Sequence, residues 1–226
     1  MEQLHLISEL MNLDHFKQAI RDIVLVHHFL FRSKVRILHC DISLHSLMVR
    51  YNDNGTVQGV LIDFDLASVG KPGGEGHHGR RTGTRRFMAI DLLEKETPPH
   101  LERFDWESLF YVICWIGTHY SNGTEIQTTA LETWDADDDE TLSLVKHSVL
   151  AGLKPNLGIL FTDFYKPLFS LWIQDMQSMF RAANLEKTKF EIAKAANPDP
   201  EEDTLVFHET LGNHVTWDKF WQILEK

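Results

Sequence analysis

The sequence has few cysteines, no long apolar run and no excess of positive charge. Its two cysteines, Cys40 and Cys114, lack the spacing of metal ligands, which fits a reduced, intracellular setting. The longest apolar stretch, Ile23 to Phe31, is interrupted by two histidines and is far shorter than the roughly 20 residues of a membrane span. A net charge of -11 argues against general nucleic-acid binding, which favours an excess of lysine and arginine.

The first residues also lack two features that guide the interpretation. Met1 is followed by Glu2, without the basic segment and apolar core of a secretory signal, so we expect no such signal. Residues 1–38 contain no glycine, so this part of the sequence offers no glycine-rich, phosphate-covering loop. We expect a soluble protein of the cytoplasm or nucleus, with no membrane or nucleic-acid partner. The sequence leaves its oligomeric state open.

Apolar periodicity predicts one mainly α domain over residues 1–226, with a small β-hairpin. A first helix is predicted over residues 14–33, with Asp14 as its N-cap. The apolar runs 47–49 and 59–62 flank Asn52-Asp53-Asn54-Gly55, a combination typical of a hairpin. Further predicted features are buried or amphipathic helices over residues 105–118, 161–181 and 217–224, and a break at Asn197-Pro198-Asp199-Pro200.

Two segments are predicted to be loops. Residues 68–86 are rich in glycine and basic within an acidic protein, which favours a mobile loop. Residues 121–141 are polar and include an acidic run from Asp135 to Glu140. We expect this second segment to be an exposed, solvated acidic insertion.

Two short stretches carry carboxylates at the edges of apolar runs. They are His39-Cys40-Asp41-Ile42 and Leu61-Ile62-Asp63-Phe64-Asp65-Leu66-Ala67. A phosphoryl-transfer site needs one acid that orients a hydroxyl nucleophile and another that holds magnesium on the nucleotide phosphates. Asp41 and Asp63 are therefore the candidate catalytic and metal-binding residues.

The order of these and later motifs resembles the large lobe of a eukaryotic protein kinase, and in particular the fungal-type protein kinase family. The motifs that follow are Arg81-Thr82-Gly83-Thr84, Phe87-Met88-Ala89-Ile90-Asp91 and Asp105-Trp106-Glu107-Ser108. Kinases carry H-R-D-L-x-x-x-N, then D-F-G, then A-P-E. The resemblance covers about residues 10–120. It implies ATP, magnesium and a protein substrate, and it makes residues 68–86 an activation-type loop.

The resemblance implies roles for four residues near the transferred phosphate. Asp41 matches the aspartate that orients the substrate hydroxyl, and Asp63 matches the aspartate that binds magnesium. Ser43 stands where many kinases have a catalytic-loop lysine beside the phosphate. Ser46 replaces the asparagine that ligates a second magnesium, so we expect it to be a weaker ligand with a different geometry.

Other matching positions imply structural support. His39 is expected to brace the loop, Thr84 to contact the catalytic aspartate, and Asp105 to hold the loop backbone. Asp91 stands at the A-P-E glutamate and is one methylene shorter. Cys40 replaces the arginine that meets a phosphorylated activation loop, so phosphate-driven ordering of that loop loses its main receptor.

The family's small lobe, with its glycine-rich strands, strand lysine and helix glutamate, has no counterpart in residues 1–38. We therefore expect a serine/threonine protein kinase-like large lobe without the small lobe, truncated and impaired, because phosphoryl transfer depends on positioning and charge stabilisation. A truncated gene model and a fragment of a longer kinase are both compatible with this absence. The alternative is a catalytically inactive pseudokinase fragment that acts as a binding scaffold. A third class, small-molecule kinases of the aminoglycoside or choline type, shares Ile62-Asp63-Phe64 but lacks the stretch from Gly83 to Ala89.

Overall fold

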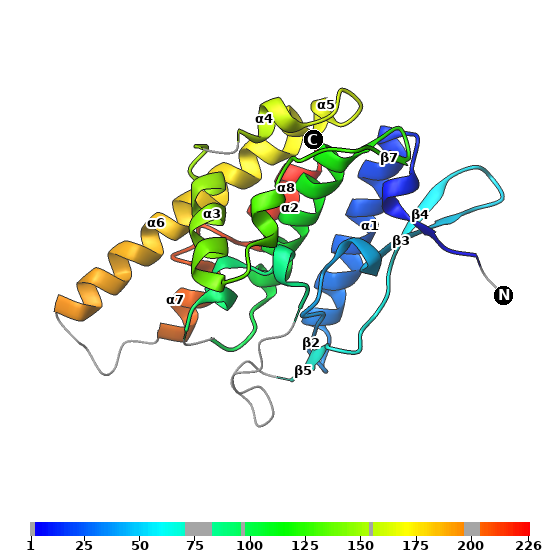
Figure 1. Ribbon diagram of the computed structural model, residues 1–226. Coiled ribbons are helices and arrows are strands. Elements are labelled where there is room, and N and C mark those ends of the chain that lie inside the picture. Colours follow the sequence, from blue (N-terminus) through cyan, green and yellow to red (C-terminus); the bar gives the residue numbers. More distant parts are fainter. Residues whose placement is uncertain (1–2, 71–82, 96–97, 154–155, 197–203) are drawn as a thin grey trace.

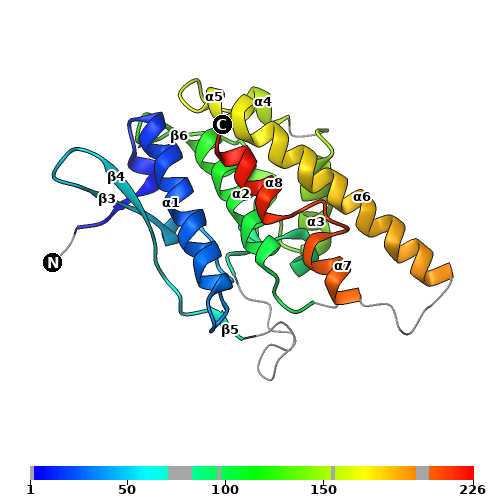
Figure 2. The same cartoon turned by 180° about the vertical axis from the view of Figure 1, so that it is seen from behind.

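The computed structural model describes residues 3–70, 83–95, 98–153, 156–196 and 204–226. The fold is mainly helical with small antiparallel sheets, as the sequence predicted. Helix α2 (Glu102–His119) lies at the centre, between α1 (Leu13–Arg32) and α6 (Gln174–Ala196), and the two opposite views in Figures 1 and 2 agree on this order. None of the described helices combines the length and apolarity that crossing a membrane requires.

Helix α1 begins slightly earlier than predicted and has a different cap. The side chain of Asn12 accepts hydrogen bonds from the backbone N–H groups of Asp14 and His15 at 2.8 and 3.1 Å. The prediction that Asp14 is the N-cap is therefore wrong. Asparagine is as good a cap as aspartate, and Asp14 instead lies in the first turn, where its carboxylate meets Lys17 at 2.8 Å.

The predicted hairpin is confirmed as β3 (Leu47–Tyr51) and β4 (Val57–Leu61), which pair antiparallel. A short strand, β1 (His5–Leu6), pairs with the other edge of β3. The hairpin lies against α1, where a Cβ on Gly59 would come within 2.1 Å of the Ala19 carbonyl oxygen. The Gly59 N–H donates to the Asp22 carboxylate at 3.0 Å, so the close approach is fixed by a hydrogen bond as well as by the missing side chain.

The hairpin and a second strand pair flank the two loops that carry Asp41 and Asp63. Strand β2 (Ile37–Leu38) leads into the first candidate loop and pairs antiparallel with β5 (Ser68–Val69), which follows the second. The remaining short elements before α3 are η1 (Ile7–Glu9), η2 (Leu44–Ser46), η3 (Arg85–Phe87), η4 (Ile90–Leu93), β6 (Tyr120–Ser121), β7 (Thr124–Glu125) and η5 (Glu132–Asp135).

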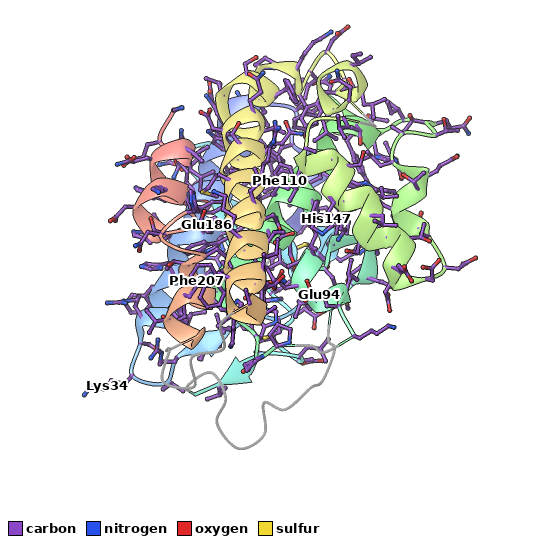
Figure 3. The ribbon with its side chains drawn as sticks, turned by 90° about the vertical axis from the view of Figure 1, so that its left-hand side faces the viewer. Lys34, Glu94, Phe110, His147, Glu186 and Phe207 are labelled. Atoms are coloured by element: carbon purple, nitrogen blue, oxygen red, sulfur yellow. The ribbon has the colours of Figure 1, made fainter. Side chains whose placement is uncertain are left out.

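The prediction of a single helix over residues 161–181 is wrong at both ends. Phe161 follows the short α4 (Leu157–Leu160), and the next helix starts only at α5 (Lys166–Leu168). Pro167 explains this start, because proline lacks the N–H that a helix interior needs and fits the first turn. The chain then passes through a π-helical turn, η6 (Phe169–Ile173), into α6, which crosses the face shown in Figure 3. The predicted break at residues 197–200 lies outside the described residues.

The last elements close the core around α2. Helices α3 (Asp139–Leu150), α7 (Thr204–Thr210) and α8 (Trp217–Leu224) complete the fold, and α8 confirms the helix predicted there. The Trp106 ring of α2 stacks on Phe220 of α8 at 5.2 Å. The Arg21 side chain of α1 donates to the Leu224 carbonyl at 2.6 Å. Every residue of α2 from Arg103 to His119 is buried, so the helix predicted over residues 105–118 is confirmed as the centre of the core.

Candidate active site

The carboxylate of Asp105, on the first turns of α2, fixes the backbone of the first candidate loop. It accepts the N–H of His39 at 2.9 Å and that of Cys40 at 3.1 Å. Two side chains, His27 and His100, contact the same carboxylate at 2.7 and 2.9 Å. Burial alone would raise the pKa of the Asp105 carboxyl, but the charge and hydrogen bonds of His100 and His27 hold it well below its usual range.

The imidazole of His39 joins the two candidate loops. Its Nε2 lies 2.8 Å from the Ile62 carbonyl, and its Nδ1 lies 3.3 Å from the Asp41 N–H. A carbonyl only accepts and an N–H only donates, so both contacts are satisfied together by the tautomer with its proton on Nε2. The edge of the Phe64 ring packs against His39 with centroids 4.7 Å apart. His39 thus sets the position of Asp41 relative to the Asp63 loop.

The carboxylate of Asp41 faces the segment that precedes η3. Its Oδ1 accepts both the backbone N–H and the hydroxyl of Thr84, at 2.6 and 2.9 Å. Gly83 makes this approach possible, because its φ is +118° and a Cβ there would come within 3.1 Å of the Cys40 carbonyl oxygen. The motif Gly83-Thr84 therefore delivers two donors to one oxygen of Asp41 and leaves the other without them.

Asp63 follows β4 and is exposed. It makes no hydrogen bond or ion pair with any residue that the structure describes. Its φ is 65°, and Cys40 in the other loop also has a φ of 65°. Left-handed backbone at residues other than glycine costs of order 1–3 kcal/mol and persists where the surroundings impose it, often at functional sites. The Asp63 carboxylate is therefore exposed and without a partner among the residues that the structure describes.

A family model described as fungal protein kinase matches residues 5–117. The chain belongs to the fungal protein kinase family. The match confirms the resemblance inferred from the motifs and has nearly the extent expected for it. A search of curated proteins gives no match.

The hydroxyl of Ser46 is hydrogen-bonded to the backbone of Ser43 within its own loop. The Ser46 hydroxyl accepts the Ser43 N–H at 2.9 Å and donates to the Ser43 carbonyl at 3.1 Å. Ser46 is 1% exposed and Ser43 is also buried. To ligate a metal, the Ser46 hydroxyl would have to give up hydrogen bonds that shape η2. Among the residues that the structure describes, no three histidine, cysteine or acidic side chains converge into a metal site.

Cys40, at the position of the kinase arginine, is buried, and its Sγ lies 3.6 Å from the Leu38 carbonyl oxygen. Burial raises the pKa of the thiol far above its usual range, so the side chain stays neutral. A buried neutral thiol offers no cation to a phosphate group.

A buried polar cluster holds the segment that follows Thr84. Lys146 of α3 is fully buried, donates to the Met88 carbonyl, and lies over the Tyr111 ring at 4.0 Å. Glu107 of α2 accepts the Ile90 N–H at 3.0 Å and the Tyr111 hydroxyl at 2.9 Å. Burial lowers the pKa of the Lys146 ammonium and raises that of the Glu107 carboxyl. The cluster ties α2, α3 and the Thr84 segment into one unit.

Asp91, at the position of the A-P-E glutamate, is buried in an ion-pair network. It pairs with Arg103 and, at 2.9 Å, with Lys187 of α6. Lys187 also meets Glu94 at 2.5 Å. Figure 3 shows Glu94 beside α6. Burial opposes the charge of Asp91, but Arg103 and Lys187 lower the pKa of its carboxyl to about 2. The shorter side chain therefore still reaches an arginine, and it reaches a lysine as well.

The acidic segment expected to be fully solvated is partly docked. Asp139 meets Arg85 at 2.8 Å and Asp135 meets Arg86 at 2.5 Å. Trp134, directly before Asp135, is only 1% exposed. The two arginines directly follow Thr84, so the insertion contacts the same segment that touches Asp41. Most of the predicted activation-type loop, residues 71–82, lies outside the described residues.

Sequence reasoning missed several residues that support the site. These residues are His27, His100, Arg103, Glu107, Lys146 and Lys187. Only His27 carried a signal, because it falls among the apolar positions that predicted α1 and a polar side chain there needs a buried partner. The others come from elements far apart in sequence, and their contacts depend on the tertiary fold.

Proposed function

We propose that this chain supplies the substrate-binding half of a serine/threonine protein kinase site, in which a protein hydroxyl attacks the γ-phosphate of ATP. The observation that carries the proposal is the double hydrogen bond from Thr84 to Asp41, on a loop whose backbone is held by Asp105. This arrangement presents one carboxylate oxygen in a fixed direction, which is what the orientation of a hydroxyl nucleophile requires.

The two oxygens of Asp41 have different tasks in this proposal. Oδ1 is occupied by Thr84, so a substrate serine or threonine would donate its hydroxyl proton to Oδ2. Transfer of that proton leaves the alkoxide oxygen to form the new P–O bond as the bond to the leaving diphosphate breaks. Bound ATP and magnesium would supply the phosphoryl group and neutralise the charge on its oxygens.

Asp63 fits a magnesium ion held mainly by nucleotide phosphates. Magnesium is commonly bound by one or two carboxylates, with water and phosphate oxygens filling its other positions. Asp63 is exposed and unpartnered among the described residues, so both of its oxygens are open to such an ion. Ser46 fits this role less well, because its hydroxyl already makes two hydrogen bonds with Ser43.

A nucleotide at Asp63 also needs a covering loop and a phosphate-binding lysine for efficient transfer. The described residues place no lysine beside Asp63 in any hydrogen bond or ion pair. In the proposed function these parts come from a small lobe, either on another segment of a longer chain or on a partner protein. The described fold is then the large lobe, and its activity by itself is low.

The test is transfer of labelled phosphate from ATP, with magnesium, to a panel of serine, threonine and tyrosine acceptor proteins. We expect slow transfer to serine or threonine that disappears in Asp41→Asn and in Asp63→Ala. Asp53→Asn, in the exposed hairpin turn, is the matched control and should keep the wild-type rate. No transfer to any acceptor, or transfer that survives Asp41→Asn, would overturn the proposal for this chain.

One observation favours a second candidate, a binding scaffold without catalysis. Phe64 and Leu66, on either side of Asp65, are 36% and 44% exposed, and apolar surface of this kind often marks a protein interface. A scaffold predicts a melting temperature that does not change with millimolar ATP and magnesium, since a ligand stabilises a protein only when it binds the folded state. A magnesium-dependent rise in melting temperature that is lost in Asp63→Ala contradicts the scaffold and supports the kinase.

A further inference from the structure

A groove of about 710 Å³ lies between the segment that leads into η5 and the outer face of α3. Its volume is within the range of about 300–1,000 Å³ that is usual for ligand sites. Its lining includes the aliphatic side chains of Leu131, Leu144, Val145 and Leu160. None of its lining residues belongs to the loops that carry Asp41 and Asp63. The groove is therefore separate from the candidate active site.

The groove offers an apolar contact that the fold does not use. Leu144, on the middle of α3, is 64% exposed, although its neighbours Leu142 and Lys146 are buried. Its exposure is unfavourable in water, because burying apolar surface lowers the free energy. A partner with an aliphatic side chain would recover part of this energy.

The surface around the groove carries negative charge that no cation of the described residues balances. Glu132 lines the groove, and Asp137 and Glu140 stand in the adjoining turn and first turn of α3. All three are exposed, and none of their carboxylates forms an ion pair or hydrogen bond with a described residue. Asp135 and Asp139, in contrast, are neutralised by Arg86 and Arg85. Glu132 thus stands in the wall of the groove, and Glu140 directly precedes Thr141, which also lines it.

We propose that this groove binds a basic peptide segment of a partner protein, in which lysines or arginines flank one leucine-like side chain. The aliphatic residue packs on Leu144, and the basic residues face Glu132 and the neighbouring carboxylates. Charge complementarity selects this occupant. A second copy of the chain would bring an equally acidic groove and a net charge of -11, and an anionic membrane surface would be repelled.

The groove has a physical connection to the Thr84 segment. Lys146, two residues from Leu144 on α3, donates to the Met88 carbonyl, and Asp139 at the start of α3 holds Arg85. A peptide on α3 therefore binds to an element that contacts the loop facing Asp41. The binding itself requires no phosphoryl transfer, so the inference stands independently of the proposed function.

The test is fluorescence anisotropy of labelled peptides added to the full chain without ATP. One peptide has lysines and arginines around a single leucine. A second has that leucine replaced by serine, and a third has its basic residues replaced by glutamate. We expect the first to bind, with weaker binding at higher salt, and the other two to bind at least about tenfold more weakly.

Two variants of the protein make the test specific to the groove. Leu144→Asp should weaken binding of the first peptide by about tenfold or more, and Glu132→Lys should weaken it and reduce its salt dependence. Leu185→Asp is the control, because Leu185 on α6 is similarly exposed, at 57%, and should leave binding unchanged. Melting curves of the variants are the check that each of them is folded.

Four results would overturn the proposal. The first is the absence of binding to the basic peptide, and the second is binding that Leu144→Asp leaves unchanged. The third is a concentration-dependent dimer in sedimentation that Leu144→Asp abolishes, because a second copy would then be the occupant. Binding to anionic vesicles that the same substitution removes would likewise replace the peptide with a membrane as the partner.

Discussion

Thr84 gives both its backbone N–H and its hydroxyl to a single oxygen of Asp41, at 2.6 and 2.9 Å. Two donors on one oxygen fix the plane of the carboxylate, since each bond restricts rotation about the Cβ–Cγ axis. The other oxygen is left for a substrate hydroxyl in the proposed kinase reaction.

We predict that Thr84→Val lowers the rate of phosphoryl transfer by about tenfold, because a hydrogen bond to a charged group contributes about 1.5–3 kcal/mol. The backbone N–H remains, so activity is reduced but not abolished. The measurement is the initial rate of transfer to a serine or threonine acceptor. Thr84→Ser keeps the hydroxyl and is the control; a loss of rate equal to that of Thr84→Val would contradict the role of the hydroxyl.

We predict that Gly83→Ala lowers the rate of phosphoryl transfer more than Gly55→Ala does. The φ of Gly83 is +118°, and an added Cβ would come within 3.1 Å of the Cys40 carbonyl oxygen. Alanine is therefore strained at this position, and the loop that carries Thr84 shifts relative to Asp41. Gly55 has a φ of +80° with nothing within 4 Å, so Gly55→Ala should cost only about 1–2 kcal/mol of stability. Transfer rates and urea unfolding of both variants separate the two effects. Equal activities in the two variants would rule out a specific role for the Gly83 contact.

We predict that Asp105→Asn destabilises the protein by about 3–5 kcal/mol, as expected when one partner of a buried charged network is removed. The amide group would place two donors against the N–H groups and histidines that now share the carboxylate. Urea unfolding followed by circular dichroism gives the free energy of unfolding. Asp137→Asn, at an exposed carboxylate that has no partner among the described residues, should change it by less than about 0.5 kcal/mol. A similar small change at Asp105 would contradict the interpretation.

We predict that the ion pairs of Asp91 stabilise the fold down to unusually low pH. The carboxyl has a pKa of about 2 in the folded protein and an ordinary value of 3.8 when unfolded. Its contribution is therefore complete above pH 3.8 and is lost as the pH falls towards about 2. The shift corresponds to about 2 kcal/mol. Urea midpoints of the wild type and of Asp91→Asn, measured from pH 5 to 2.5, should converge in that interval; a constant difference across it would contradict the prediction.

The sequence predicted the elements whose signals are local. The apolar periodicity of α1, α2 and α8 and the Asn/Asp/Gly cluster of the hairpin were sufficient to place them. The prediction of one helix over residues 161–181 failed, because the apolar spacing continued through Phe161 and Phe164, where the chain instead turns. Pro167 carried the missing information, since it can stand in a first turn but not in an interior.

The contact between Thr84 and Asp41 was predictable, because a motif fixes both residues and their spacing. The catalytic role of Asp41 and the magnesium-binding role of Asp63 stay predictions. The partners of Asp105 and Asp91 were not predictable in the same way. His100 and Lys187 reach them from different elements, and no local pattern states which buried cation will meet which acid. The docking of Asp135 and Asp139 on two arginines escaped prediction for the same reason, because a charge run is identical in sequence whether it is solvated or paired.

The packing of α8 on α2 has a consequence for synthesis of the protein on the ribosome. Trp106 stacks on Phe220, and Arg21 donates to the Leu224 carbonyl. Helices α2 and α1 therefore complete their packing only after residues of α8 have been translated. Until those residues leave the ribosomal exit tunnel, one side of an apolar helix stays uncovered. Nascent chains in this state are prone to aggregation, and we expect chaperones that recognise apolar segments to bind this chain during most of its translation.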